Sequence, residues 1–237
     1  MSTPPSDLCA PTSAPALSGQ SPLSIGAALQ AERASRALSA ALSRPGPPFP
    51  LPSNPRHLLL STAPGLLIGS IVWPGTHALL AFLAARPALL RGARVLELGA
   101  GVGALGLGAL ALGASAALLT ERAGHTALLE HNVRVNAGGA AEVAELAWGG
   151  AGWGAFAARA AAFAPTLCLG ADLVYTAEGA EALAETLGAL RGVPLYLAYK
   201  ERGAGEALYA ALEAQRLSVK EVGVEGEHRV LLITAIV

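Results

Sequence analysis

The sequence predicts an α/β fold: a mostly parallel sheet of seven strands, covered by helices on both faces and closed by a C-terminal antiparallel hairpin. Three observations predict it. Short apolar runs alternate with segments of helical periodicity, the first run leads straight into a glycine-rich turn, and two β-type runs end the chain. Consecutive strands that are separated by helices require crossovers, which are right-handed and make the strands parallel. With 237 residues, of which 53% are hydrophobic, the chain can bury a sizeable core.

The expected elements follow one another in a regular order. The runs predicted as parallel strands are residues 94–98, 116–120, 141–146, 166–171 and 194–199. The segments predicted as helices are residues 103–112, 124–136, 155–162, 177–190 and 205–215. Residues 217–222 and 229–237 are separated by two glycines and polar residues, which is typical of a hairpin. This hairpin adds an antiparallel strand to an otherwise parallel sheet.

Residues 1–56 differ from the rest of the chain because they are rich in proline, serine and alanine. We interpret them as an N-terminal extension, partly disordered, with one helix at residues 24–43, and residues 57–237 as the folded domain. The extension has few acids and several arginines and serines, which is compatible with an organelle-targeting signal. The alternative, a loosely docked extension, leaves the protein in the cytoplasm, which is the compartment we expect.

Charge and composition exclude several classes of function. The chain has 16 basic and 17 acidic residues, so it lacks the basic field that binds nucleic acids or anionic lipids. Residues 57–85 and 98–120 carry no charge over a length that could span a bilayer, but Pro-Gly pairs or six glycines interrupt them. Two cysteines, and no paired Cys or His spacing, predict neither a disulfide framework nor a metal site. We expect no nucleic-acid partner, no membrane insertion and no metal.

The strongest functional signal is the sequence VLELGAGVG at residues 95–103, a strand that leads into alternating glycines. Glycines let a backbone approach a ligand closely, and ligands of such sheets bind beyond the carboxyl ends of the strands. Residues 101–106 also match GxGxxG, a weak dinucleotide fingerprint in a chain with 28 glycines. Glu121 ends the second strand, where a carboxylate suits the ribose of NAD and of S-adenosylmethionine equally. Glu97 would repel a pyrophosphate but suits a cationic ligand, which favours S-adenosylmethionine.

Six segments, in order and at matching spacing, resemble the seven-strand S-adenosylmethionine-dependent methyltransferases. Within these Rossmann-like enzymes the chain is similar to the lysine methyltransferase-like branch, methyltransferase family 16, over about residues 69–237. The six segments are IVWP with LAFL (71–83), the cofactor loop LELGAGVG (96–103), LTER (119–122), the helix at 129–136 with its two asparagines, ELAWG (145–149), and LGADLVY (169–175), which resembles the family's DxxY signature.

The resemblance implies S-adenosylmethionine as cofactor and a role for each matching position. Trp73 and Trp148 would flank the cofactor, with Trp148 near the adenine, and plain core packing is the alternative for both. Glu121 would hold the ribose diol, where the family usually has Asp. The other cofactor-binding residues that the resemblance implies are Glu97, Gly99, Ala100, Gly101, Gly103 and Ala171. Asp172 and Tyr175 would be the catalytic residues that face the methyl group, unless Asp172 caps the helix after it.

The function that follows from the resemblance is transfer of a methyl group to the lysine amine of a protein substrate. The expected partner is a chaperone or a translation factor, and the enzyme is expected to be a monomer. Because a neighbouring carboxylate raises the pKa of an amine, Asp172 would orient the amine rather than act as an efficient base. Tyr199 and Glu201 are weaker acceptor-site candidates. Two alternatives stay open: a non-catalytic scaffold that binds S-adenosylmethionine, and a nicotinamide-dependent oxidoreductase.

Overall fold

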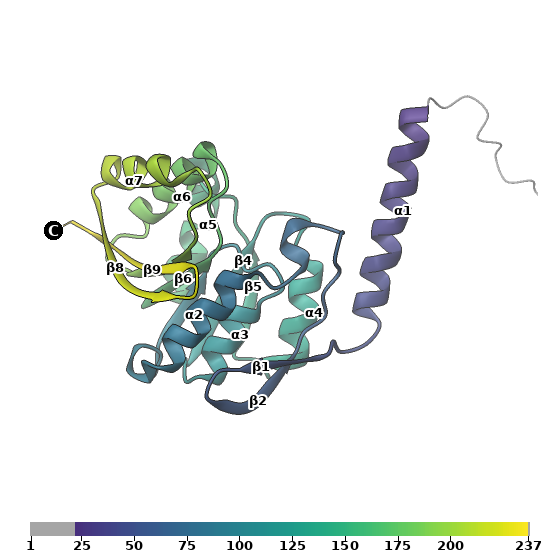
Figure 1. Ribbon diagram of the computed structural model, residues 1–237, viewed down its shortest axis with the longest axis horizontal. Coiled ribbons are helices and arrows are strands. Elements are labelled where there is room, and N and C mark those ends of the chain that lie inside the picture. The colour runs from purple at the N-terminus through teal and green to yellow at the C-terminus, as the bar shows by residue number, and fades with distance from the viewer. Residues whose placement is uncertain (1–21, 237) are drawn as a thin grey trace, which may run out of the picture.

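The computed structural model describes residues 22–236 and contains the predicted seven-stranded sheet (Figure 1). Its strands are β3 (Arg94–Glu97), β4 (Ala116–Glu121), β5 (Ala141–Glu145), β6 (Leu167–Ala171), β7 (Leu195–Tyr199), β8 (Leu217–Glu225) and β9 (His228–Ala235). They lie in the order β5-β4-β3-β6-β7-β9-β8. Strands β3 to β7 are parallel, whereas β9 pairs antiparallel with both β7 and β8. The closing hairpin is therefore confirmed.

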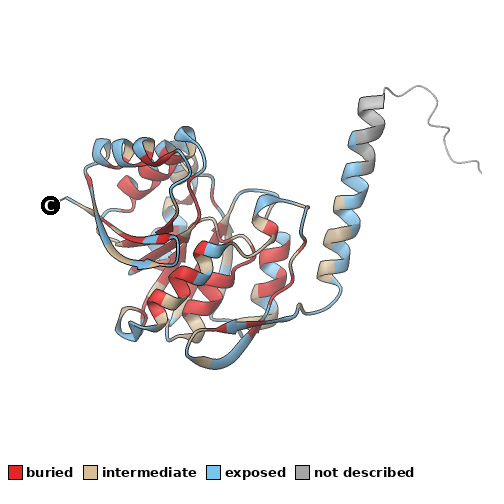
Figure 2. Ribbon diagram, in the orientation of Figure 1, coloured by how far each residue is buried: buried red, intermediate tan, exposed pale blue. Residues whose placement is uncertain are grey.

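Helices cover both faces of this sheet, as predicted. Within the described residues they are α2 (Pro74–Ala84), α3 (Ala104–Ala111), α4 (Ala127–Asn136), α5 (Gly150–Phe163), α6 (Ala177–Ala189) and α7 (Gly205–Ala214). They are preceded by helix α1 (Pro22–Leu42), and 3-10 turns lie at Ile68–Ser70 and Pro87–Leu89. Successive strand residues point to opposite faces. Val95 enters the core shared with α2, α3 and α4, and Leu96 enters the core shared with α5, α6 and α7. Figure 2 shows the buried residues gathered where the helices face the sheet.

The path of the chain reverses across the sheet at β3. The chain runs from β3 through β4 to β5 on one side, and then returns to β6, which pairs with the other edge of β3. Loops that leave adjacent strands in opposite directions open a crevice at the carboxyl ends of those strands. The two motifs at residues 95–103 and 169–175 therefore meet at one place, because they follow β3 and β6.

A small antiparallel sheet that the sequence does not predict precedes the large one. β1 (Pro48–Leu51) pairs with β2 (Asn54–Leu59), so the domain boundary expected at residue 56 falls inside β2. Phe49 and Leu51 are buried in the core that contains α3 and α4. Proline has no backbone N–H and pairs only at the edge of a sheet, which is why this proline-rich segment resembles a tail in the sequence.

Two asparagines of α4 fasten the N-terminal hairpin to the domain. The side-chain amide of Asn136 exchanges two hydrogen bonds with the backbone of Leu59, at 2.8 and 3.0 Å. The buried amide of Asn132 exchanges two with Ser61, at 2.9 and 3.0 Å, and donates a third to the carbonyl of Val102 at 2.9 Å. Because a buried amide is costly unless it is paired, these bonds tie the hairpin to the glycine turn after β3.

Helix α1 projects away from the rest of the domain (Figure 1). Its bounds agree with the helix predicted at residues 24–43. Leu38, Ala41 and Leu42, near its end, pack against the core that contains α4. The remainder of the expected extension, residues 1–21, lies outside the described residues. No helix of residues 22–236 is both long enough and apolar enough to cross a membrane.

Candidate active site

The glycine turn between β3 and α3 lies against neighbouring chain segments with no room for side chains. Gly99 and Gly101 have φ angles of 62° and 55°, in the left-handed region that favours glycine. A Cβ on Gly99 would come within 2.8 Å of a methyl group of Leu173 and 3.2 Å of the Trp148 ring. A Cβ on Gly101 would come within 2.9 Å of the carbonyl oxygen of Gly69. Glycine is therefore required at both positions for close packing of this turn, which we call the Gly99–Gly101 cradle.

A cavity of about 540 Å³ opens beyond this turn, at the carboxyl ends of β3, β4 and β6. Its volume lies in the range of about 300–1,000 Å³ that is typical of small-molecule sites. The predicted site residues that line it are Trp73, Glu97, Gly99, Ala100, Gly101, Glu121, Trp148, Ala171, Asp172 and Tyr175. The structure therefore brings together residues that the sequence places up to about 100 positions apart, all but one of the predicted set.

Gly103 is the predicted cofactor-binding residue that does not line this cavity. It is the N-cap residue immediately before α3 and has a φ angle of 83°, and a Cβ there would come within 2.6 Å of the Leu129 side chain and 3.2 Å of the Leu119 side chain. Gly103 therefore faces the hydrophobic core. Its glycine is required for the tight turn into the helix and for close packing, which the sequence pattern alone does not distinguish from ligand contact.

Glu97, at the end of β3, is a buried carboxyl group at the floor of the cavity. It is 3% exposed, and its Oε2 accepts a hydrogen bond of 2.9 Å from the backbone N–H of Gly106 in the first turn of α3. Burial raises the pKa of Glu97 from 4.5 to about 8; the negative charge of Glu121 also raises it, and the bond from Gly106 opposes this. A cationic ligand that entered the cavity would favour the charged form of Glu97.

Glu121, at the end of β4, is fixed to the glycine turn. Its Oε2 accepts a hydrogen bond of 3.0 Å from the N–H of Gly101, and its Oε1 accepts one of 2.9 Å from the N–H of Arg122. The side chain of Glu, which is one methylene longer than that of Asp, reaches the backbone of the turn. Each carboxylate oxygen has a second lone pair, so Glu121 can still accept a hydrogen bond from a ligand hydroxyl.

The two tryptophans lie at different parts of the cavity. Trp148, after β5, lies against the glycine turn, because its ring would be 3.2 Å from a Cβ on Gly99. Trp73 immediately precedes α2, and its indole N–H donates a hydrogen bond of 2.7 Å to the carbonyl of Ile68. The Trp73 ring lies 6.4 Å from the Tyr175 ring, centroid to centroid, in an edge-to-face arrangement. The mouth of the cavity is therefore aromatic.

Asp172, after β6, is held by the start of α2 instead of capping the helix that follows it. It has a φ angle of 52°, and its Oδ2 accepts a hydrogen bond of 2.7 Å from the N–H of Gly75. The cap of α6 is Thr176, whose hydroxyl oxygen accepts a hydrogen bond of 3.1 Å from Gly179. The alternative role for Asp172, as the cap of α6, is therefore wrong. Asp172 lies close to α6 along the chain, but the turn after β6 points its carboxylate towards α2.

Two residues that the sequence does not indicate complete the surroundings of Asp172. Arg202, in the loop after β7, and His228, the first residue of β9, each place a side-chain nitrogen 3.2 Å from Asp172 Oδ1. By contrast, the candidate Glu201 accepts hydrogen bonds from Tyr199 and from the backbone before α7, and neither residue lines the cavity. No spacing rule links positions 30 and 56 residues apart, so only the fold reveals this cluster.

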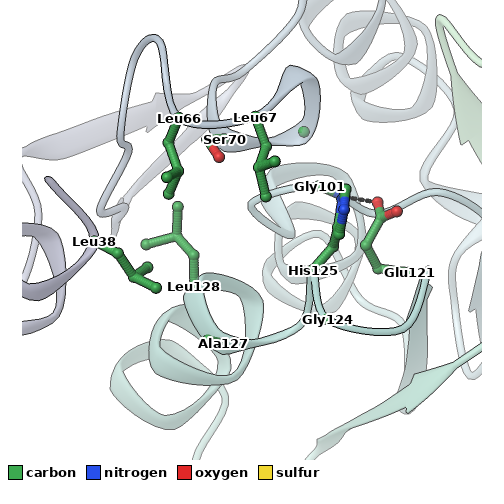
Figure 3. A pocket seen from close by; sticks show the side chains of 11 residues that line it. Leu38, Leu66, Leu67, Ser70, Gly101, Glu121, Gly124, His125, Ala127 and Leu128 are labelled. Carbon is green, nitrogen blue, oxygen red and sulfur yellow. Dashed lines mark hydrogen bonds between the residues drawn. The ribbon is translucent and has the colours of Figure 1, made fainter. Parts of the chain in front are cut away.

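A second, much smaller cavity of about 30 Å³ lies on the outer side of the glycine turn (Figure 3). Leu66, Leu38 of α1 and Leu128 of α4 converge on one side of it, while Gly101 and Glu121 lie on the other. Its volume suits about one or two water molecules. The end of α1 therefore lies near the edge of the main cavity at which Glu121 is bonded to the turn.

The residues of the main cavity fit S-adenosylmethionine. The Gly99–Gly101 cradle lines the cavity and offers backbone contact, and Trp148 offers an aromatic surface for a base. Glu121 can accept from ribose hydroxyls, and the buried Glu97 matches a cationic amino-acid portion but not a pyrophosphate. A mostly parallel seven-stranded sheet with this site at its switch point defines the class of S-adenosylmethionine-dependent methyltransferases.

Comparison with known proteins specifies the class further. A family model described as lysine methyltransferase matches residues 54–215, and the chain belongs to this family. The fold is similar to the 16S rRNA N2 G1207 methyltransferase of T. thermophilus in complex with AdoMet and guanosine (TM-score 0.57, 21% identity, 81% of this chain and 51% of that one). The ribosomal protein L11 methylase of Lactobacillus delbrueckii subsp. bulgaricus is 17% identical, with a TM-score of 0.49, over 65% of this chain and 75% of that one. No curated protein sequence matches the chain.

Proposed function

We propose that this methyltransferase transfers a methyl group from S-adenosylmethionine to the side-chain amine of a lysine in a protein substrate. The family description supports lysine as the acceptor. The observation that carries the proposal is the aromatic mouth formed by Trp73 and Tyr175. Aromatic faces accommodate both the apolar stem of a lysine and its cationic end.

The chemistry divides between the two ends of the cavity. S-adenosylmethionine supplies a methyl group that its sulfonium already activates. The residues that would hold this cofactor are Glu97, Gly99, Ala100, Gly101, Glu121, Trp148 and Ala171. Those that would face the acceptor are Asp172, Tyr175 and Trp73, which would also flank the cofactor. Positioning of an acceptor in line can supply up to ~7–11 kcal/mol of the barrier. The main task of this chain is therefore to orient the amine.

The amine must lose a proton before it can act as a nucleophile, because the pKa of a lysine is about 10.4 in water. Removal from water beside the Trp73 and Tyr175 rings lowers that pKa. Burial raises the pKa of Tyr175 above its ordinary value, and the charge of Asp172 adds to the effect. The Tyr175 phenol therefore keeps its proton and can either donate a hydrogen bond to the neutral amine or accept one from it.

The proposal extends to the partner and its location. A net charge of −1 supports a protein substrate over a nucleic acid. We place the activity on a chaperone or a translation factor, carried out by a monomer in the cytoplasm, without a membrane or a metal. The alternative location is an organelle, to which residues 1–56 would direct the protein.

The test is transfer of a deuterated methyl group from labelled S-adenosylmethionine into a cell extract, followed by mass spectrometry of proteins, RNA and small molecules. We expect the label on a lysine of one or a few proteins. Tyr175→Ala lowers transfer about tenfold or more, whereas Tyr209→Ala, which removes an equally exposed tyrosine on α7, leaves it unchanged (exposed fractions of 41% and 39%). Label found only in RNA or in small molecules contradicts the lysine proposal.

A further inference from the structure

The carboxylate of Asp172 is buried and is already paired by three groups of the protein itself. Its side chain is 2% exposed. Oδ2 accepts the 2.7 Å hydrogen bond from Gly75, while Oδ1 receives Arg202 Nη2 and His228 Nε2, each at 3.2 Å. Because a carboxylate only accepts hydrogen bonds, His228 must donate from Nε2. With these partners in place and the side chain almost completely buried, the carboxylate offers an incoming amine little access.

These contacts connect both halves of the aromatic mouth. Gly75 lies in the first turn of α2, two residues after Trp73, so the bond to Asp172 fixes the start of the helix that carries this ring. Tyr175 follows Asp172 by three residues in the loop after β6. One carboxylate therefore sets the position of two aromatic side chains from separate segments.

Arg202 joins the same assembly from a third direction. Its guanidinium carbon lies 5.6 Å from the centroid of the Trp73 ring and 6.0 Å from that of the Tyr175 ring. Both distances are within the range of cation–π attraction. The side chain of Arg202 is 31% exposed and that of His228 is 6% exposed. Arg202 therefore lies on the solvent side of Asp172, and His228 lies on its buried side.

We propose that Arg202 and His228 are positioning residues for methyl transfer, which act through Asp172 to hold Trp73 and Tyr175 at the acceptor end of the cavity. The inference rests on the proposed function and assigns Asp172 a supporting role in place of direct contact with the amine. A carboxylate that is already paired leaves the desolvating effect of the rings intact, which favours the neutral, nucleophilic amine.

The kinetic test compares variants that break each contact with variants that preserve it. Arg202→Met and His228→Leu remove the donors, whereas Arg202→Lys keeps a cation and His228→Gln places an amide N–H near the position of Nε2. We expect kcat to fall about tenfold or more in the first pair, with the Kd for S-adenosylmethionine unchanged, and to recover to within about threefold of wild type in the second pair. Arg229→Gln, which breaks an exposed ion pair with Glu221, is the matched control and leaves kcat unchanged.

A second measurement needs neither cofactor nor acceptor. With Trp148 and Trp153 replaced by phenylalanine, Trp73 is the single tryptophan of the chain. In this background we expect Arg202→Met and His228→Leu to raise the acrylamide quenching constant of Trp73 about twofold, and Arg202→Lys to leave it near the reference. Arg202 is partly exposed, so its variants keep the test decisive if His228→Leu does not fold.

The outcomes separate the two proposals. If Arg202→Met and the folded His228 variants leave both the quenching of Trp73 and kcat unchanged, the positioning role is wrong. A different result also overturns the inference: Asp172→Asn lowers kcat without changing the quenching of Trp73, while Arg202→Lys recovers kcat. That result means that Asp172 contacts the amine directly. If the wild type methylates no lysine, but quenching responds as expected, the positioning network stands and the proposed acceptor is wrong.

Discussion

Replacement of Glu97 by glutamine should change how the stability of the cofactor-free protein depends on pH. In the unfolded chain this carboxyl group loses its proton near its ordinary pKa of 4.5, whereas in the folded protein burial keeps it protonated up to about pH 8. Between these values the folded protein binds more protons than the unfolded one, so the free energy of unfolding falls as the pH rises. Glu97→Gln removes the ionisation but keeps an oxygen that can accept from Gly106.

The magnitude follows from the same pKa values. Each pH unit inside this interval costs about 1.4 kcal/mol, so between pH 5 and pH 8 the contribution of Glu97 to the free energy of unfolding falls by about 4 kcal/mol. Below pH 4.5 the group is protonated in both states and its contribution is constant. We therefore expect the variant and the wild type to have similar stability near pH 5, and the variant to be more stable by up to about 4 kcal/mol at pH 8.

The assay is urea unfolding followed by circular dichroism at pH 5, 6, 7 and 8, with the difference between variant and wild type taken at each pH. Glu213→Gln, which removes an exposed carboxylate on α7, is the matched control and should give a difference that hardly changes with pH. If the difference for Glu97→Gln is equally flat, Glu97 ionises in the folded protein as it does in water, and the reasoning about burial at the cavity floor is refuted.

Two further variants test the cofactor end of the cavity by titration calorimetry. Gly101→Ala should raise the Kd for S-adenosylmethionine about tenfold or more, because its Cβ would meet the Gly69 carbonyl at 2.9 Å. Gly138 has a similar φ of 53° but open space around it, so Gly138→Ala should leave the Kd unchanged. Equal effects of the two variants would contradict a role of the Gly99–Gly101 cradle in binding. Trp148→Ala should also weaken binding about tenfold, since it removes the aromatic wall. Trp153 packs against the core that contains α5, α6 and α7, so Trp153→Ala should leave the Kd within about twofold of the wild-type value. An unchanged Kd in Trp148→Ala would show that Trp148 does not belong to the cofactor site.

The fold follows from the sequence because local patterns encode it directly. Alternating apolar runs and helical segments specify the strands and crossovers, and the glycine turn after β3 specifies where a ligand binds. The β1–β2 hairpin escapes prediction because its strands contain prolines, so burial of Phe49 and Leu51 comes from tertiary packing that overrides local preference.

The candidate site is predictable only in part, for a related reason. Residues at strand ends, such as Glu97 and Glu121, are found because the topology fixes their location. Arg202 and His228 are not, since they meet Asp172 only through the order of β6, β7 and β9 in the sheet. Gly103 shows the converse error: a glycine that belongs to the motif faces the core and not the cavity.

The most direct test of the account is a crystal structure of the protein with S-adenosylhomocysteine. We expect the ligand in the cavity at the ends of β3, β4 and β6, with its adenine against Trp148, its ribose hydroxyls within hydrogen-bond distance of Glu121, its amino-acid portion towards Glu97, and its sulfur open towards Trp73 and Tyr175. A ligand bound elsewhere, or one whose sulfur faces away from this aromatic mouth, would contradict the claim that the cavity is the site of methyl transfer.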